Sequence, residues 1–274
     1  MFGFKKKKLH LNPRYGKAET PSVHEFTLEK YYDLYSRSTE GAEKIHTLIL
    51  GATPELRDIV LSYGHQLTVV DRNKEALEEK TRLMHYKNSP LEKVIIGDWL
   101  NIDFPANYFD VILGDGVLTA LDKAEQQKLL KILKKILKPT GSLLLREEAK
   151  ATEKINFDPS DIVSHYRSGH YNIFDLFFGL RLHNKNYKAV DPKTQRIRLQ
   201  DFLNKLDEYN KNGIISQEEL KQLKSVAEEL EHTLLSKTEI EQALHNQFSP
   251  REITHDIGSG HLSPWYFFLH QPRD

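Results

Sequence analysis

The chain has 274 residues, 39 basic and 39 acidic side chains, and no cysteine. The balanced charge argues against a nucleic-acid partner, and the lack of cysteine excludes disulfides, thiolate metal sites and a cysteine nucleophile. No apolar run is long enough to span a membrane, and a cysteine-free chain suits a reducing compartment, so we expect a cytoplasmic protein.

The first residues, "MFGFKKKKLH", contain a basic cluster from Lys5 to Lys8. No apolar segment follows this cluster, so it is not a secretory signal. We interpret it as a solvated tail. The alternative is an electrostatic arm for an anionic surface, with Phe2 and Phe4 as apolar anchors.

Residues 25–38 predict a helix with Phe26, Tyr31 or Tyr32, and Tyr35 near one face. From Ile45 onward, apolar runs alternate with segments of helical period. The runs "TLIL", "LTVV", "KVII", "FDVILG" and "GSLLLRE" predict strands, and helices are expected from Pro54 to Tyr63, Asn73 to about Tyr86, and about Lys123 to Lys138. Asp122 and Glu125 have capping-box spacing before the last helix, which "KPTG" is expected to end. Such alternation predicts an α/β fold with a doubly wound, mostly parallel sheet covered on both faces.

After about Ala151 the alternation stops, and residues 160–246 show helical patterns with almost no strand signal. The segment "REITHDIGSGHLSPWYFFLHQ" then reads as two strands around a loop. We therefore predict a helical insertion or lid at 151–246 before a C-terminal strand hairpin. Residues 1–150 and 247–274 would form one cofactor-binding domain.

Polar residues follow four of the predicted strands, at the edge where open α/β sheets bind ligands. After the first strand, Gly51 permits a tight turn, Thr53 can cap the next helix, and Pro54 suits its first position. Glu55 in the first helical turn places negative charge where a pyrophosphate would bind, although it also complements the helix dipole.

The next strand ends at Asp71, 20 residues after Gly51, where an acidic residue commonly binds ribose hydroxyls. Asp98 follows the third strand and is a candidate acceptor for an adenine amino group, while Trp99 would stack beside the ring or pack the loop. After the fourth strand, Gly114 and Gly116 flank Asp115. A capping Asp and a glycine-rich turn are the structural alternatives for these loops.

In this order and spacing, "LILGATPE", "VVD", "GDW", "FDVILGDG" and "LKPTGSLLL" resemble the class I S-adenosylmethionine-dependent methyltransferases. The resemblance covers about Leu48 to Glu148, and the C-terminal hairpin fits the last two strands of that family. It implies a Rossmann-like sheet of seven strands and S-adenosylmethionine as the cofactor. Ile49 stands where the family usually has an acidic residue, so we hypothesise that Glu55 supplies that charge to the methionine ammonium.

The resemblance implies a cofactor site formed by Gly51, Ala52, Thr53, Glu55, Asp71, Arg72, Asp98, Trp99 and Asp115. Asp115 and Glu147 are the candidates for residues near the methyl group. The Asn/Asp-Pro-Pro-aromatic motif of amine methylation on bases or glutamine is absent, because the fourth strand leads into "GDGV". Since methyl transfer needs mainly orientation and exclusion of water, no catalytic triad or metal site is expected.

The candidate acceptor-binding residues are Tyr31, His165, His170 and Tyr171, although an aromatic helix face is more often part of a core. We expect a small-molecule acceptor, and the oligomeric state is open. The alternatives are a non-catalytic cofactor-binding or interaction module on the same fold, or an NAD-type oxidoreductase, which the missing G-x-G-x-x-G spacing disfavours.

One further pattern, Glu208 to Glu219 in "EYNKNGIISQEE", has the spacing of an EF-hand loop with a central glycine at Gly213. Its first ligand is Glu rather than Asp, and no second hand accompanies it. A helix-turn-helix with an Asn-Gly turn explains the same residues, and we favour that reading over calcium binding.

Overall fold

The computed structural model describes residues 25–150, 158–171, 173–183, 199–229, 233–256 and 264–273. Within these ranges, one sheet has the strand order β3-β2-β1-β4-β5-β7-β6. Its strands are β1 (His46–Leu50), β2 (Gln66–Asp71), β3 (Glu92–Ile96), β4 (Phe109–Asp115), β5 (Leu137–Glu148), β6 (Phe248–His255) and β7 (Trp265–Pro272). β1 to β5 are parallel, and β7 pairs antiparallel with both β5 and β6. The predicted seven-stranded sheet with a C-terminal hairpin is confirmed.

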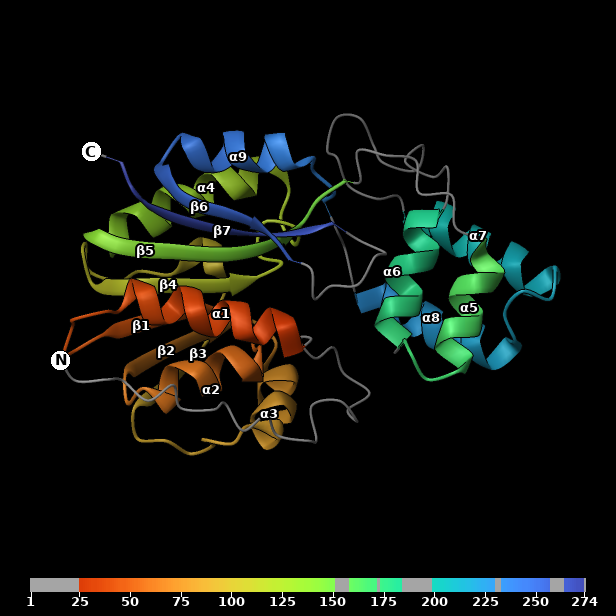
Figure 1. Cartoon of the computed structure of the whole chain (residues 1–274), viewed down its shortest axis with the longest axis horizontal. Helices are drawn as coiled ribbons and strands as arrows, with labels where there is room; N and C mark the ends of the chain where they lie inside the picture. Colours follow the sequence, from red (N-terminus) through yellow and green to blue (C-terminus); the bar gives the residue numbers. More distant parts are fainter. Residues whose placement is uncertain are drawn as a thin grey trace.

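Helices cover the two faces of the sheet (Figure 1). One face packs against α1 (Glu25–Ser38), α2 (Pro54–Ser62) and α3 (Lys74–Leu83), and the other against α4 (Lys123–Ile136) and α9 (Lys237–His245). The alternate side chains of the strands divide between two apolar cores: Leu48 and Leu50 face α4, while Ile49 faces α1 and α2.

The insertion consists of α5 (Pro159–Arg167), α6 (Ile173–His183), α7 (Leu199–Lys211) and α8 (Gln217–Glu229), which lie together beyond the end of β5 (Figure 1). These helices share an apolar cluster that includes Leu176, Leu206 and Leu223, all fully buried. The predicted boundary at residue 246 places α9 with the insertion. However, the buried α9 residues Ile240 and Leu244 belong to the core that α4 forms with the sheet.

Two local predictions are corrected by tertiary packing. The helix at 25–38 is confirmed, but Phe26 is 58% exposed, and the buried face carries Leu28 and Leu34 beside the tyrosines. The capping box of Asp122 and Glu125 is present, but α4 ends at Ile136, before "KPTG". Leu137 already pairs with Phe109, so the strand pairing ends the helix early.

The expectation that both faces of the sheet are covered is wrong at the β3 edge. Between β3 and β4 the described chain has a short 3-10 turn, η2 (Trp99–Asn101), in place of a full helix. Ile95, which points to the same face as Val70, is therefore only half-buried. Val94 and Ile96 point to the opposite face at the edge of the sheet, where they are 43% and 52% exposed. None of the described helices combines the length and the apolar character that a membrane span needs.

Candidate active site at the carboxyl edge of the sheet

The strand register brings the predicted cofactor residues into one row. Leu50 pairs with both Val70 and Gly114, so Gly51, Asp71 and Asp115 leave the sheet side by side. Asp71 pairs with Ile96, which places Asp98 two residues beyond on the next strand. Neighbouring strands lie about 4.8 Å apart, so the row spans the width of a nucleoside.

The Gly51 turn has the shape that the sequence predicts. Gly51 has a φ of +105°, which glycine adopts readily, and its N–H donates to the Val70 carbonyl at 2.9 Å. The Trp99 indole N–H donates to the same carbonyl at 2.8 Å. A Cβ on Gly51 would lie 3.8 Å from the Trp99 ring, so this ring packs the loop.

The first turn of α2 departs from the expected capping. Thr53 occupies the N-cap position and Pro54 the first helical position, but the Thr53 side chain makes no capping hydrogen bond, so that prediction is wrong. Glu55 is 2% exposed. Direct contact between its carboxylate and a cofactor would therefore require the surrounding side chains to move.

Asp71 and Asp98 both stabilise the loops that they begin. Asp71 Oδ1 accepts from the Asn73 N–H at 2.8 Å, and Asp98 accepts from the Leu100 N–H at 3.0 Å and the Asn101 amide at 2.7 Å. Their structural roles are thus real, but a carboxylate has about four acceptor positions and keeps capacity for a ligand. Arg72, next in the chain, is exposed, and Ala52 beside Gly51 is half-buried.

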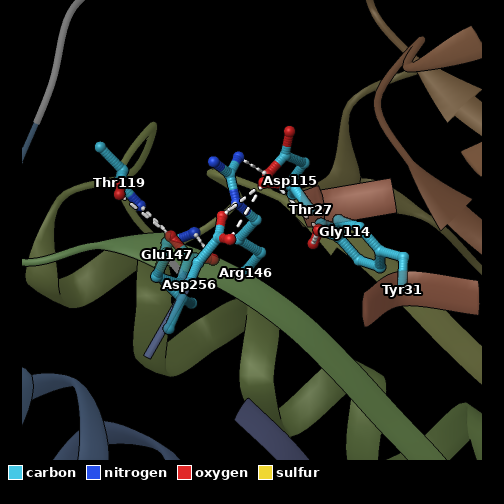
Figure 2. Close-up of polar contacts among 9 residues, drawn as sticks. Thr27, Tyr31, Gly114, Asp115, Thr119, Arg146, Glu147 and Asp256 are labelled. Carbon is cyan, nitrogen blue, oxygen red and sulfur yellow. Dashed lines mark hydrogen bonds and ion pairs between the residues drawn. The ribbon is translucent and has the colours of Figure 1, made fainter. Parts of the chain in front are cut away.

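Asp115 belongs to a polar network at the ends of β4 and β5 (Figure 2). Its Oδ1 accepts from Arg146 Nη1 at 2.9 Å and from the Tyr31 hydroxyl at 3.4 Å. Tyr31 also donates to the Gly114 carbonyl at 2.9 Å, and Arg146 Nε donates to Asp256 at 2.6 Å. Asp115 is thereby held at the edge of the sheet.

Arg146 and Asp256 are functional candidates that the sequence analysis missed. Arg146 pairs with Asp115 across β4 and β5, while Asp256 directly follows β6, 110 residues along the chain from Arg146. A charged residue inside the apolar run "LLLRE" is the available signal for Arg146, because a buried cation requires partners. No local signal identifies Asp256.

Glu147 points to the opposite face from Arg146 and is fully buried. It accepts from the Leu118 N–H at 2.9 Å and from the Thr119 N–H and hydroxyl at 3.1 and 3.0 Å (Figure 2). These bonds fix the loop after β4. Burial raises the pKa of Glu147 to about 7, against the lowering effect of the three hydrogen bonds. A direct role beside the methyl group stays a prediction that this burial does not favour.

The pKa of Glu147 predicts a pH dependence of stability. The pKa of this carboxyl is 4.5 in the unfolded chain and about 7 in the folded protein, so the folded state holds the proton more tightly. The resulting stabilisation is complete below pH 4.5 and is lost as the pH rises to 7. The expected loss is about 3 kcal/mol in the free energy of unfolding. Urea denaturation from pH 4.5 to 8 should show this fall in the wild type relative to Glu147→Gln. A constant difference between the two proteins would contradict it.

Comparison with Glu147→Gln is needed because His270 acts in the opposite direction. Burial lowers the pKa of His270 to about 4, so its contribution to stability is present above pH 6.5 and is lost as the pH falls to 4. Both proteins retain His270, so its effect cancels in the difference.

The four candidate acceptor residues do not lie together: the Tyr31 hydroxyl belongs to the network at the end of β4, whereas His165, His170 and Tyr171 lie in the insertion. Tyr31 is 1% exposed beneath β4, and burial raises the pKa of its hydroxyl well above the ordinary value. His165 stacks on Tyr171 with ring centroids 5.3 Å apart, and His170 lies 6.0 Å from His165. Tyr171 lies just before the first residue of α6. Arg181, which joins the insertion to the sheet through an ion pair with Glu148, lies roughly 12 Å from the start of that helix.

The residues from Glu208 to Glu219 form a helix-turn-helix. α7 continues to Lys211, so the first two presumed calcium ligands are helical, and Gly213 turns the chain with a φ of +73°. Glu219 forms a capping box with Ser216 and a two-pronged ion pair with Arg167 at 2.8 Å. Across the described ranges, no group of three or more His, Asp or Glu side chains has a geometry that could hold a metal ion. The geometry therefore favours the helix-turn-helix, because Glu219, the last presumed calcium ligand, is bound to Arg167 and Ser216.

A groove of about 740 Å³ runs along the uncovered β3 edge, lined by residues such as Thr68, Ile95 and Phe104. Asp98 lies at its margin, but Gly51, Asp71 and Asp115 are not part of its lining. The groove results from the missing helix between β3 and β4, and it is separate from the row of strand-end residues.

The comparisons with known proteins agree with this geometry. The profile of the methyltransferase-domain family matches residues 51–145, which begin at the Gly51 turn and end within β5. The strand order, with an antiparallel β7 between β5 and β6, differs from the all-parallel dinucleotide-binding order. The chain has the class I methyltransferase fold. No curated protein matches its sequence.

Several solved structures resemble this chain in fold at low identity. The N-methyltransferase NodS from Bradyrhizobium japonicum, in complex with S-adenosylhomocysteine, is 13% identical over 95% of this chain and 96% of its own, with a TM-score of 0.55. A Burkholderia thailandensis 1,6-didemethyltoxoflavin-N1-methyltransferase is 10% identical over 90% and 78%, with a TM-score of 0.53. A Rhodobacter sphaeroides protein described as a zinc-dependent alcohol dehydrogenase is 12% identical over 92% and 91%, with a TM-score of 0.56. At such identities the likeness establishes the fold alone.

Proposed function

We propose that this chain binds S-adenosylmethionine along the row of strand-end residues and transfers the methyl group to a small-molecule acceptor. The observation that carries the proposal is the register, which sets Asp71, Asp98 and Asp115 beside the Gly51 turn at the carboxyl edge of the methyltransferase fold. Polar groups at this edge are where open α/β sheets bind nucleosides.

The residues present suit a cofactor without phosphate. Gly51 has no Cβ and a φ of +105°, so the backbone can approach a ligand closely. Three carboxylates follow the neighbouring strands, and Glu55 stands at the N-terminus of α2, where a pyrophosphate would meet like charge. A cationic cofactor with a ribose and an adenine meets no such repulsion.

When bound, the cofactor supplies an activated methyl group. We assign binding of the ribose hydroxyls to Asp71 and of the adenine amino group to Asp98. This order across β2 and β3 directs the methyl end toward Asp115 on β4. The chain then needs only to orient the acceptor and exclude water, because a neutral nucleophile requires no base before methyl transfer.

Two of the structural neighbours support the cofactor and the acceptor class. The NodS complex contains S-adenosylhomocysteine, and the Burkholderia enzyme was solved with 1,6-didemethyltoxoflavin and S-adenosylhomocysteine bound. Their matches cover 95% and 90% of this chain. A small-molecule acceptor is the proposal consistent with them.

Calorimetry with S-adenosylmethionine, S-adenosylhomocysteine and NAD tests the proposal. We expect both sulfur compounds to bind, with a Kd of about 1–100 μM, and NAD not to bind. Binding of NAD alone would favour the oxidoreductase. Binding of S-adenosylmethionine without methylation of any component of a metabolite extract would favour a non-catalytic module. Glu55→Gln belongs in the same series, since unchanged affinity would reject a contact between Glu55 and the methionine ammonium.

A further inference from the structure

Three charged side chains meet beside the predicted methyl end of the row (Figure 2). Arg146 donates to Asp115 through Nη1 at 2.9 Å and to Asp256 through Nε at 2.6 Å. Its guanidinium also lies 4.2 Å from the centre of the Trp265 ring. One positive and two negative groups leave the cluster with a formal charge of −1.

The excess charge is presented by Asp115 and not by Asp256. Asp256 is 2% exposed, and both of its oxygens accept from the Thr27 hydroxyl, at 3.0 and 2.8 Å. Asp115 uses Oδ1 alone, whereas its Oδ2 has no hydrogen-bond partner among the described residues, and its side chain is 17% exposed. Figure 2 shows this second oxygen pointing away from the network.

Asp115 stands where an acceptor would meet the cofactor. It leaves β4 beside the Gly51 turn, because Gly114 pairs with Leu50. Asp71 and Asp98 leave the sheet on the opposite side of that turn, from β2 and β3. If the adenosine lies over β2 and β3, as the proposed function requires, the methyl-bearing end of the cofactor reaches β4 and Asp115.

We propose that the acceptor is an amine, and that Asp115 Oδ2 accepts a hydrogen bond from its N–H. Arg146 is the positioning residue that holds Asp115 at this edge. The inference rests on the proposed function and specifies its substrate class.

The charge on the acceptor atom during methyl transfer distinguishes amines from the other common acceptors. When a neutral amine is methylated, its lone pair forms the N–C bond, the C–S bond breaks with its electron pair on sulfur, and positive charge moves to nitrogen. The methylated ammonium then loses its proton to water. A phenolate or carboxylate acceptor instead brings negative charge to the site. An anionic Asp115 attracts the developing ammonium and repels the phenolate or carboxylate.

Sinefungin tests this without knowledge of the acceptor, because a carbon bearing an ammonium group replaces the methyl-bearing sulfur of the cofactor. Calorimetry on the full chain should show sinefungin binding about tenfold more tightly than S-adenosylhomocysteine, the gain expected from one charge-assisted hydrogen bond. Asp115→Asn should reduce this ratio to near one, whatever change it makes in the affinity for S-adenosylhomocysteine itself.

Equal affinities in the wild type, or an unchanged ratio in Asp115→Asn, would overturn the amine assignment while the proposed function stood. Failure of both compounds to bind would instead overturn the proposed function. Asp110→Asn is the matched control: Asp110 lies at the other end of β4, where it accepts from Lys138 at 2.6 Å. The Asp110→Asn substitution removes the same charge from the same strand and should leave the ratio of sinefungin to S-adenosylhomocysteine affinity unchanged.

Arg146→Gln separates positioning from a purely structural role. If Arg146 is only structural, its replacement should lower the affinities for sinefungin and S-adenosylhomocysteine by the same factor. If Arg146 positions Asp115, the replacement should lower the affinity for sinefungin more, and so reduce the ratio of the two. Arg146→Lys, which keeps the charge, should recover part of the ratio. An equal loss for both ligands would overturn the role of Arg146. Because Arg146 is buried, Asp115→Asn decides the amine assignment should Arg146→Gln not fold.

Discussion

Alanine in place of Asp71 is expected to weaken S-adenosylhomocysteine binding by about 100-fold, and asparagine by about tenfold. The carboxylate can accept from two ribose hydroxyls, and hydrogen bonds to a charged group are stronger than those to a neutral one. Asparagine keeps an oxygen for the Asn73 N–H, which Asp71 binds at 2.8 Å, so it tests the charge with the turn intact.

Asn73→Ala is the matched control for a disturbed loop. Asn73 caps α3 by accepting from the Ala76 N–H at 2.9 Å, and its removal should lower the free energy of unfolding by about 1 kcal/mol. S-Adenosylhomocysteine affinity should stay within about threefold of the wild type. If Asn73→Ala weakened binding as much as Asp71→Asn, or if Asp71→Asn bound like the wild type, the ribose role of Asp71 would be rejected.

The row of strand-end residues could be predicted from the sequence because its signals are local. Each apolar run ends at a polar residue, and parallel strands separated by helices bring those ends to one edge. Gly51, Asp71, Asp98 and Asp115 therefore lie together as predicted. Their chemical roles do not follow from placement alone, which is why binding experiments decide them.

The network around Asp115 could not be predicted in the same way. Arg146 and Asp256 meet only because β7 inserts between β5 and β6 and the hairpin returns to the edge of the sheet. Tyr31 shows the related difficulty on a helix: its period identifies a buried face but not what lies opposite. Only the fold reveals that its hydroxyl donates to the Gly114 carbonyl at 2.9 Å.

The exposure of the β3 edge could not be predicted from the sequence for the same reason. "KVII" reads as a fully buried strand because all three of its apolar residues are consecutive. Burial depends on the segments that pack against the strand, and residues 97–108 supply only the short turn η2 between β3 and β4. An apolar run predicts that a strand forms but does not show how many faces are covered.

A second large effect is expected at the buried ion pair that fixes α2 beneath the Gly51 turn. Arg57 is fully buried and donates to both oxygens of Glu92, at 2.7 and 3.0 Å, and to the Thr81 hydroxyl at 2.9 Å. Glu92→Gln leaves the guanidinium buried beside a neutral group. We expect the free energy of unfolding to fall by about 3–5 kcal/mol, measured by urea denaturation.

Removing both charges should be far less harmful than removing one. In the double variant Arg57→Met with Glu92→Met, no charge remains to desolvate, and stability should return to within about 1 kcal/mol of the wild type. The control is Glu78→Gln in the exposed Lys74–Glu78 pair, at 3.7 Å, where the loss should stay below about 0.5 kcal/mol. A loss below about 1 kcal/mol for Glu92→Gln would mean that water reaches Arg57. A restored double variant would instead show that the buried pair adds no net stability.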